Sequence, residues 1–433
     1  MIGQIIFAAL FLAALYFFSR NFRNILKNIR LGRKEDRSDQ ASLRWKNMLL
    51  VAFGQRKMFK RPVPAILHLM VYLGFVIINI EMLEIIIDGL AGTHRVFSGM
   101  GKLYSVLIAS FEYLAFLVLL GCFVFLLRRN LLRIKRFFGQ EMGSWPKTDA
   151  NLILITEILL MGAFLLMNAA DQKLQALGVD PYVQAGSFPI SAFLVSLLPQ
   201  AADSLILIER GAWWFHIIGV LAFLNYLVIS KHLHIILAFP NTYFADLHPK
   251  GKFQHLEHVH QEVKAMLDPS FTPQPVEENL RFGAQDVEDL SWKSLLDAYT
   301  CTECGRCTSV CPAHTTGKLL SPRKIMMDTR DRLEEVGKQK QDPAFQGDGK
   351  RLLDDYISRE ELWACTTCNA CVEACPVNIN PLRIIMELRQ YAVMEESQAP
   401  APINAMLGNI ENNAAPWKYA QADRANWRDK AES

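Results

Sequence analysis

Long uninterrupted apolar runs dominate the first 240 residues of the chain. Four of these runs are long enough to cross a bilayer as helices, because about 20 apolar residues span its hydrocarbon core. A fifth run, at the N-terminus, is only just long enough, and we expect a retained anchor and not a secretory signal, since no small-residue cleavage site follows it. The predicted spans are residues 2–18, 63–87, 102–127, 151–169 and 212–239.

Two shorter segments of this half are apolar in part. Residues 41–61 mix Leu, Val, Phe and Trp with Lys and Arg, which is typical of a helix lying in the membrane interface. Residues 187–199 are too short to span, and we expect a re-entrant or surface helix there. After Pro240 the chain becomes polar. We divide it into a transmembrane domain, a linker, a soluble domain and a C-terminal tail, at residues 1–240, 241–290, 291–394 and 395–433.

Charge is distributed unevenly between the two halves. Residues 1–240 hold 24 Lys and Arg against 14 Asp and Glu, whereas residues 241–433 hold 22 against 29. An acidic soluble half does not favour nucleic-acid binding. In the membrane half, 13 basic residues lie in the segment 20–62 and 6 in 128–150, against 4 in the alternate loops. The positive-inside rule therefore predicts a multi-pass inner-membrane protein with its N-terminus outside and its soluble half in the cytoplasm.

Eight of the nine cysteines lie in two copies of one motif beyond residue 300. Each copy has the spacing C-x2-C-x2-C-x3-C followed by proline, which is typical of ferredoxins that hold two four-iron clusters. In such pairs the first three cysteines hold one cluster and the fourth reaches the other. The expected ligand sets are Cys301, Cys304, Cys307 and Cys375 for one [4Fe-4S] cluster, and Cys365, Cys368, Cys371 and Cys311 for the second.

Zinc is the alternative, since paired C-x2-C motifs also bind it. Two complete copies with the trailing proline favour iron and sulfur, and thiols in the cytoplasm stay reduced. The residues between and after the motifs, 312–364 and 381–394, have a helical composition. The sequence thus predicts an all-α protein, a five-span bundle followed by a helical domain with two clusters. Cys122, inside a span, has no assigned role.

Histidines in the predicted spans indicate a haem site. His68 lies early in the second span and His234 late in the fifth, so both are expected at one depth on the cytoplasmic side. If the fifth span is one helix, His216 and His234 share a face about 5 turns apart, whereas His232 faces nearly the opposite way. We therefore expect His68 and His234 to hold a haem b between two helices. The alternative is that each is only a hydrogen-bonded packing residue.

A second haem would need a partner for His216 near the outer end of the bundle. The candidate is His94, in or near a loop; otherwise His94 is solvated and His216 lines a quinone pocket. Ionisable side chains in spans are costly and usually face a cavity or a partner. Four glutamates are candidates for a proton path that accompanies quinone reduction, or for structural pairing: Glu81, Glu84, Glu112 and Glu157.

Both halves resemble known families. The segments GQRKMFKRPVPAILHLMVYLGF, around His68, and WWFHIIGVLAFLNYLVISKHLHIILAFPN, around His216 and His234, resemble the haem b subunits of respiratory nitrate reductase and heterodisulfide reductase. The cysteine half resembles the α-helical ferredoxin domain of succinate dehydrogenase and heterodisulfide reductase. The whole layout is similar to membrane iron-sulfur oxidoreductases related to heterodisulfide reductase, some of which resemble electron-transfer-flavoprotein:menaquinone oxidoreductases.

The resemblance implies an oxidoreductase subunit that relays electrons between a cytoplasmic partner and menaquinone, through two clusters and one or two haems. Longer relatives continue into CCG domains, which are absent here, so the resemblance implies a separate CCG-domain or flavoprotein subunit, docked by the tail from residue 395. No dinucleotide or flavin motif appears, so the chain is expected to act only within a complex. The alternative function is a membrane-anchored iron-sulfur scaffold or assembly subunit, without haem or quinone chemistry.

Overall fold

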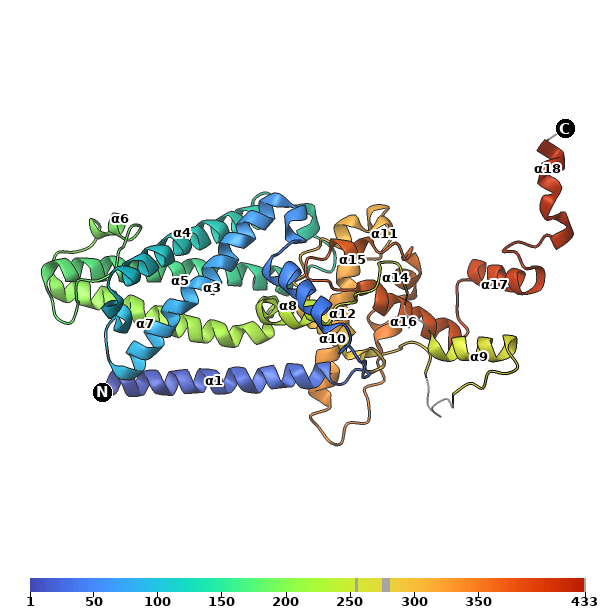
Figure 1. The fold of residues 1–433 in the computed structure, drawn as a ribbon, viewed down its shortest axis with the longest axis horizontal. Coiled ribbons are helices and arrows are strands. Elements are labelled where there is room, and N and C mark those ends of the chain that lie inside the picture. The colour runs from blue at the N-terminus through green and yellow to red at the C-terminus, as the bar shows by residue number, and fades with distance from the viewer. Residues whose placement is uncertain (254–255, 275–280, 432–433) are drawn as a thin grey trace.

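Helices and two isolated β-bridges make up the described part of the chain, which is residues 1–253, 256–274 and 281–431 of the computed structural model. Figure 1 shows an elongated molecule in which a bundle of long helices lies at one end and the cysteine-containing domain lies beside its other end. The N-terminus lies at the free end of the bundle. The expected all-α fold is confirmed.

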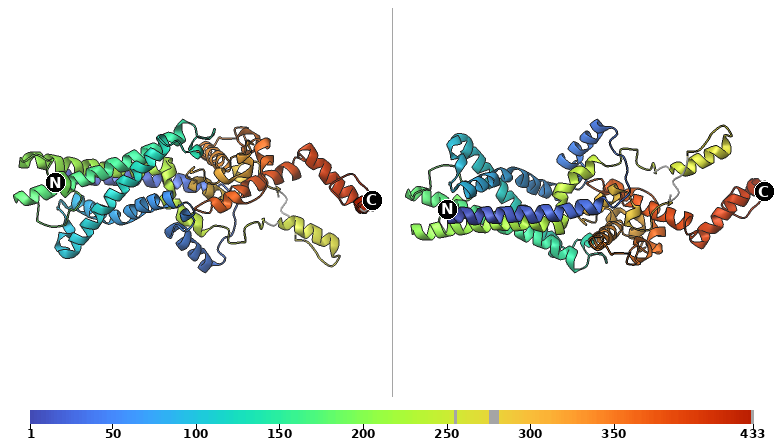
Figure 2. Two further views of the ribbon diagram at one scale, coloured as in Figure 1. Left: turned by 90° about the horizontal axis from the view of Figure 1, so that it is seen from above. Right: turned by 90° about the horizontal axis from the view of Figure 1, so that it is seen from below.

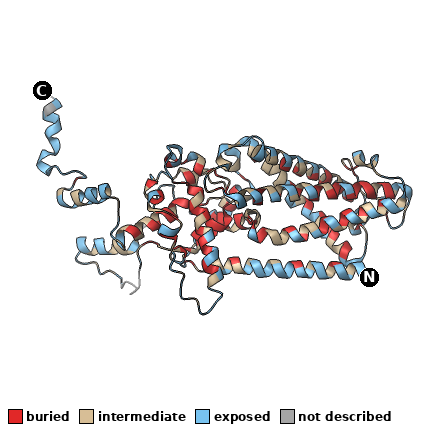
Figure 3. Cartoon of the chain, turned by 180° about the vertical axis from the view of Figure 1, so that it is seen from behind, coloured by how far each residue is buried: buried red, intermediate tan, exposed pale blue. Residues whose placement is uncertain are grey.

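Five helices of the described residues are long and apolar enough to cross a membrane, as predicted. They are α1 (Ile2–Ile29), α3 (Pro62–Ala91), α4 (Lys102–Asn130), α5 (Ser144–Leu177) and α7 (Ala202–Tyr226). The first four extend past the predicted apolar runs, because polar residues continue a helix outside the hydrocarbon layer. Their outward faces are exposed and their buried residues lie between helices, as helices surrounded by lipid require (Figure 3).

The bundle is assembled around α5, which contacts α4 on one side and α7 on the other. Helix α3 pairs with α4, and α1 lies against α7 (Figure 2). Fully or nearly fully buried side chains fill the space between these helices, among them Ile108, Phe111, Phe164 and Ile217. The chain is a membrane protein on this architecture.

The fifth span is not the continuous helix over 212–239 that the sequence predicts. Helix α7 ends at Tyr226, two short 3₁₀ turns follow (η5, Leu227–Ile229; η6, Lys231–Leu233), and α8 begins at His234 and ends at Tyr243. Ser230, between the two turns, is extended, with φ −118° and ψ 151°. The apolar composition of this stretch conceals the break, because hydropathy does not record backbone direction.

Asp149, at the start of α5, explains the break. Its carboxylate accepts hydrogen bonds from the Tyr226 hydroxyl (2.5 Å), the Ser230 hydroxyl (2.6 Å) and the Lys231 amide (3.1 Å). The Ser230 hydroxyl also accepts from the His232 amide at 3.1 Å. A side chain from another helix thus replaces the hydrogen bonds that an unbroken helix would make.

The two shorter apolar segments are only partly helical. Residues 41–61 form α2 (Ala41–Met48), a π-helical turn (η1, Leu49–Phe53) and a 3₁₀ turn (η2, Met58–Lys60). The predicted surface helix at 187–199 is reduced to the single turn α6 (Ala192–Val195). The loop around α6 is instead held by Glu112 of α4 through hydrogen bonds.

The soluble domain consists of short helices around one apolar core. They are α10 (Trp292–Thr300), α11 (Pro312–Thr315), α12 (Pro322–Gln339), α13 (Leu352–Asp355), α14 (Arg359–Ala364), α15 (Ala370–Ala374) and α16 (Pro381–Met394). Residues 281–290, which we assigned to the linker, belong to this domain: Ala284 and Leu290 are fully buried in its core. Asp286 pairs with Arg332 of α12 at 2.7 Å.

The membrane bundle and the soluble domain share one continuous core. Ile25 and Ile29 of α1, and Leu237 of α8, are buried in the same apolar cluster as Leu295 of α10 and Leu333 of α12. Accordingly α1 contacts both α10 and α12, and α8 contacts α10. The two halves are therefore packed as one body and not joined only by a tether.

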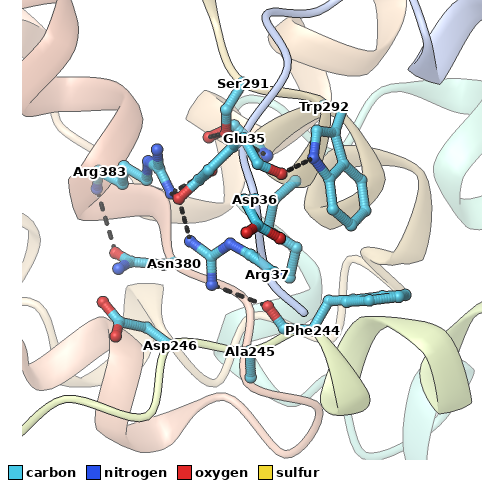
Figure 4. A network of polar contacts seen from close by, with 12 residues as sticks. Glu35, Asp36, Arg37, Phe244, Ala245, Asp246, Ser291, Trp292, Asn380 and Arg383 are labelled. Atoms are coloured by element: carbon cyan, nitrogen blue, oxygen red, sulfur yellow. Dashed lines mark hydrogen bonds and ion pairs between the residues drawn. The ribbon is translucent and has the colours of Figure 1, made fainter. Parts of the chain in front are cut away.

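Glu35 adds a polar connection at this junction (Figure 4). Its carboxylate accepts hydrogen bonds from Arg37 (2.9 Å) and from Arg383 of α16 (3.1 Å). The Trp292 indole donates to the Glu35 carbonyl at 2.8 Å, and Arg37 donates to the Phe244 carbonyl at 2.8 Å. The segment after α1 is thereby joined to both α8 and the soluble domain.

Three helices lie outside this body. Helix α9 (Glu257–Leu267) falls in the predicted linker, and α17 (Ala401–Asn413) and α18 (Asn426–Ala431) fall in the tail, with the 3₁₀ turn η9 (Gln421–Ala425) between them. None of them has a fully buried residue, and all three point away from the bundle (Figures 1 and 2).

Candidate redox site

Each cysteine motif forms a loop at the end of a helix. The first, Cys301 to Cys311, lies between α10 and α11, and the second, Cys365 to Cys375, begins where α14 ends. Gly305 in the first loop has φ +68°, and a Cβ there would lie 2.6 Å from the Arg323 guanidinium. Only glycine fits that backbone at that distance from its neighbour.

The fourth cysteine of the first motif lies with the first three of the second. Cys311, Cys365, Cys368 and Cys371 line a single cavity, whose apolar wall includes Leu320, Leu382 and Ile385. The crossed arrangement that we expect for the second cluster is the one found in this cavity. Cys368 is the exposed member of the set, whereas Cys311 and Cys371 are buried.

The other four cysteines are also neighbours. Burial raises the pKa of the Cys301 thiol to about 12, and the nearby Cys304 and Cys375 contribute to the rise. Burial likewise raises the pKa of Cys375 to about 11, with Cys304 contributing, and the pKa of Cys307 lies well above its ordinary value for the same reasons. Four buried thiols that oppose one another's ionisation suit a cationic cluster, which stabilises thiolates.

The spacing of these side chains suits a cluster better than a single ion. Among the residues that the structure describes, no three His, Cys, Asp or Glu side chains converge on one metal position. Each set of cysteines surrounds a volume instead of a point. This geometry fits a four-iron cubane with a thiolate at each iron, and does not fit the tetrahedral zinc alternative.

His68 and His234 face each other at the end of the bundle next to the soluble domain. Their ring centroids are 6.3 Å apart and the rings are inclined by 45°. Two imidazoles that coordinate one iron from opposite sides, each through a bond of about 2 Å, have centroids roughly 6 Å apart. The separation of this pair therefore fits a haem iron between them.

Both rings are oriented through their other nitrogen. The Nδ1 of His68 donates to the Gln55 side-chain oxygen at 3.1 Å, and the Nδ1 of His234 donates to the Lys231 carbonyl at 3.0 Å. These bonds leave both Nε2 atoms without their protons and available as ligands. Gln55, which is buried and has φ +49°, had no distinguishing signal in the sequence.

The prediction that His232 faces away from His234 is wrong. The helix break places the two rings side by side, with centroids 5.6 Å apart, and the His232 ring lies 5.3 Å from Phe223. The Nε2 of His232 is buried and has no hydrogen-bond partner among the described residues. Counting turns along an assumed continuous helix cannot distinguish these two histidines.

Three ionic or hydrogen-bonded contacts connect the histidine pair to the first cysteine loop. Lys231, whose carbonyl orients His234, pairs with Glu303, which lies between Cys301 and Cys304. On the His68 side, Arg306 donates to the Met58 carbonyl at 3.4 Å, and Arg61 donates to the Ser309 hydroxyl at 2.8 Å. The first cysteine set therefore lies beside the histidine pair, and the second set lies beyond it.

His94 and His216 occupy separate surroundings. The His94 ring lies against Tyr182, with centroids 4.8 Å apart, and its Nε2 is 3.6 Å from the Asp171 carboxylate. The Nδ1 of His216 donates to the Leu160 carbonyl at 3.0 Å, and its ring lies beside Phe164. No ring contact joins His94 to His216 among the described residues. The second haem stays a prediction without a paired ligand set.

The four glutamates are all buried but differ in their partners. Glu112 accepts from the amides of Ile190 (2.8 Å) and Ser191 (3.1 Å) and from Asn168 (3.2 Å), so it fixes the loop around α6. Glu84 accepts from the Phe97 amide and the Tyr104 hydroxyl. These two have the structural role that was the alternative to a proton path.

Glu81 and Glu157 have no such bonds. The Oε2 of Glu81 is buried without a hydrogen-bond partner among the described residues, and Glu157 lies buried on α5. Glu81 lines a cavity at the end of the bundle remote from the cysteines, together with His94, Arg95, Asp171 and Trp213. The Nδ1 of His94 is also unpartnered there. Arg95 and Asp171 form a buried ion pair that no pattern in the sequence had indicated.

Fold and site together define an all-α membrane protein with a two-cluster ferredoxin domain. Residues 300–379 match the model of the 4Fe-4S dicluster domain family. The chain is 31% identical, over 96% of its length, to a "Probable iron-sulfur-binding oxidoreductase FadF" of Bacillus subtilis, and covers 59% of that protein. It is 27% identical, over 91% of its length, to an "EtfAB:quinone oxidoreductase" of Syntrophomonas wolfei, and covers 55% of it.

Shorter matches extend the comparison to the soluble domain. Over 106 residues the chain is 37% identical to an iron-sulfur relative from Methanosarcina acetivorans, part of a ferredoxin/F(420)H(2)-dependent CoB-CoM heterodisulfide reductase. That match covers 24% of this chain and 52% of the relative. The chain is thus a homologue of membrane and soluble iron-sulfur oxidoreductases, and it spans less than two thirds of the length of the first two relatives. No solved structure matches it.

Proposed function

We propose that the chain is the membrane electron-transfer subunit of a quinone-linked oxidoreductase. The observation that carries this proposal is the His68–His234 pair, with centroids 6.3 Å apart, in direct contact with the first cysteine loop. Two iron-sulfur clusters and a haem b bound at these positions would supply one-electron carriers between a two-electron donor and a two-electron quinone. The names of the two longest-matching relatives support this class of reaction.

The arrangement of ligands gives the relay an order. Exposure of Cys368 makes the second cysteine set the one that a soluble donor reaches. The buried first set, Cys301, Cys304, Cys307 and Cys375, lies between it and the histidine pair. His68 and His234 are then the entry into the membrane domain. The direction of flow reverses if quinol is the donor.

For the quinone we propose the cavity at the remote end of the bundle. A quinone oxygen needs a hydrogen-bond donor and, on reduction, a proton. The unpartnered Nδ1 of His94 and Oε2 of Glu81 line this cavity, where Glu81 is 3% exposed. Menaquinone is the quinone that the family resemblance implies. Electrons would cross the bundle to reach it, a span that a second haem at His216 would shorten.

The partner and the orientation belong to the same proposal. A flavoprotein or CCG-domain subunit would supply electrons to the exposed second cluster, and the tail helices α17 and α18 offer it a docking segment. The basic loops place the soluble domain in the cytoplasm of a cell with an inner membrane. Identification of the proteins that co-purify with the full chain tests this part.

Haem content tests the central claim. The purified protein is expected to show a b-type spectrum on reduction, and replacing His68 or His234 with Ala is expected to remove most of the haem. His248→Ala, at an exposed histidine paired with Asp246, is the matched control. A wild-type protein without b-type bands favours the scaffold alternative, and full haem in both variants refutes the pairing.

A further inference from the structure

A large basic cavity lies where the membrane bundle meets the soluble domain. Its volume is about 380 Å³, in the range of ligand-binding pockets. Eight Lys and Arg side chains line it against three Asp and Glu. The walls come from the segment after α1, from residues 245–252 after α8, and from α15 and α16 of the soluble domain. Any occupant would therefore contact both halves of the molecule.

Some of the cationic side chains have partners that neutralise them. Arg37 and Arg383 share Glu35, as Figure 4 shows, and Lys293 pairs with Asp297 at 2.7 Å. These pairs form the inner wall. They position the segment but contribute little net charge to the cavity.

The remaining cations are not fully neutralised. Lys60 and Lys250 both pair with one carboxylate, Glu373 of α15. No carboxylate of the described residues pairs with Arg56 or with Lys57, whose ammonium donates only to the Val372 carbonyl (3.2 Å) and the Asn378 amide oxygen (2.9 Å). Like charges held together without counter-ions are unfavourable unless an anion joins them.

The cavity adjoins an apolar surface that suits acyl chains. Asn47 and Val51, which line it, belong to α2 and the π-helical turn that follows. The other side of these elements exposes Trp45, Leu49 and Phe53. An amphipathic segment of this kind lies in the membrane interface, with apolar side chains in the acyl region and basic ones at the headgroups. The basic cavity then opens at the depth of lipid phosphates.

We propose that this cavity binds a phosphate group, and that an anionic phospholipid of the adjoining leaflet supplies it. Arg56, Lys60 and Lys250 contact the phosphate, and the acyl chains lie along Leu49 and Phe53. A lipid held in this way is bound to the membrane segment by its tails and to α15 of the soluble domain through the cations around Glu373. The lipid stabilises the junction beside the first cysteine set.

The test uses the full-length protein with its clusters, purified in detergent and stripped of lipid. Native mass spectrometry measures binding of phosphatidylglycerol, of phosphatidylcholine with the same acyl chains, and of inorganic phosphate. We expect phosphatidylglycerol to bind with at least tenfold higher affinity than the other two. Equal binding of both phospholipids overturns the proposal, and phosphate binding as tight as that of phosphatidylglycerol overturns the lipid as its source.

Two sets of variants locate the site. The triple change Arg56→Gln, Lys60→Gln and Lys250→Gln is expected to weaken phosphatidylglycerol binding roughly a hundredfold, since each cation near an anionic surface contributes about fivefold. The matched control carries the same loss of charge at exposed lysines outside the cavity: Lys318→Gln, Lys338→Gln and Lys418→Gln. Equal weakening in both triple variants assigns the effect to net charge and overturns the site.

Glu373→Gln gives a change in the opposite direction. Removing the carboxylate that two lysines share frees both for the phosphate, so affinity for phosphatidylglycerol is expected to rise about fivefold. This gain does not depend on a variant that loses stability. The absorbance of the clusters verifies that each variant is folded, and an unchanged or lower affinity in Glu373→Gln contradicts the proposal.

Discussion

The nitrogen that a histidine leaves free decides what it can bind, and at His68 and His234 the protein uses Nδ1 for orientation. Gln55 and the Lys231 carbonyl accept these protons at 3.1 and 3.0 Å. Groups that orient a ligand histidine typically change metal affinity when they are removed. His232 lies beside His234 but has no such arrangement. Residue-scale geometry thus distinguishes two neighbours that the sequence alone did not place correctly.

Gln55 is expected to act as a positioning residue for the haem site. Gln55→Ala removes the acceptor of the His68 Nδ1 proton, so haem affinity is expected to fall about 10- to 100-fold. Gln55→Glu restores an acceptor, and its negative charge makes the imidazole more electron-donating, so the haem midpoint potential is expected to fall. Haem titration and a spectroscopic redox titration measure both effects. Gln4→Ala, at the other end of the bundle, is the control, and an unchanged potential in Gln55→Glu contradicts this role.

Cysteine variants test the crossed ligand sets. Cys311→Ser is expected to alter the same cluster as Cys368→Ser, because both line one cavity, although Cys311 belongs to the first motif. Electron paramagnetic resonance of the reduced protein distinguishes the clusters, and iron analysis is expected to fall from about eight non-haem irons toward four. If Cys311→Ser instead alters the cluster that Cys301→Ser alters, the crossed assignment is wrong. Cys122→Ala is expected to retain both clusters.

At the scale of elements, the break between α7 and α8 positions His234. The chain leaves the helical path at Ser230 and resumes it at His234. This change of direction places the imidazole against His68 of α3. Asp149 of α5 stabilises the break with three hydrogen bonds. The position of the histidine pair therefore depends on a third helix.

Removing the Asp149 carboxylate tests this dependence. Asp149→Ala leaves the Tyr226, Ser230 and Lys231 donors unsatisfied, and is expected to destabilise the protein by about 3 kcal/mol. We also expect reduced haem content, since the loop before His234 loses its anchor. Thermal unfolding and the haem-to-protein ratio measure the two effects. Asp149→Asn, which keeps part of the hydrogen bonding, is expected to lie between, and a wild-type haem ratio in Asp149→Ala contradicts the argument.

At the scale of the whole molecule, membrane bundle and soluble domain behave as one packed body. The shared core of α1, α8, α10 and α12 and the Glu35 contacts hold the first cysteine set beside the histidine pair. Electron transfer between fixed centres requires such constant geometry. A tethered domain would have to dock before each transfer.

The Glu35 contacts predict a dependence of stability on pH. Burial alone would raise the pKa of Glu35, but Arg383 and Arg37 outweigh it and hold the pKa below 4.5. A lowered carboxyl pKa stabilises the folded state above the unfolded-state pKa, and this stabilisation is lost as the pH falls through the folded-state value. Glu35→Gln is thus expected to lower the unfolding temperature at pH 7, with the difference from wild type shrinking below about pH 4.5. A difference that is constant with pH contradicts the assignment.

Patterns with a short repeat were predictable from the sequence alone. Long apolar runs require helices in a membrane, because only there are all backbone groups satisfied internally, so the five spans were found correctly. The cysteine spacing identified the two-cluster domain, since three ligands come from one loop. The separation of His68 and His234 along the chain still indicated a pair at one depth.

Tertiary structure decided what depends on contacts between distant residues. The Asp149 carboxylate breaks the fifth span, and this break determines where His232 and His234 lie. Glu112 has a structural role because a loop about 80 residues away supplies its donors. The basic cavity exists only where segments near residues 56, 250 and 373 meet. A linear sequence records which charges and hydrogen-bonding groups exist, whereas the partner of each is determined only when the helices pack.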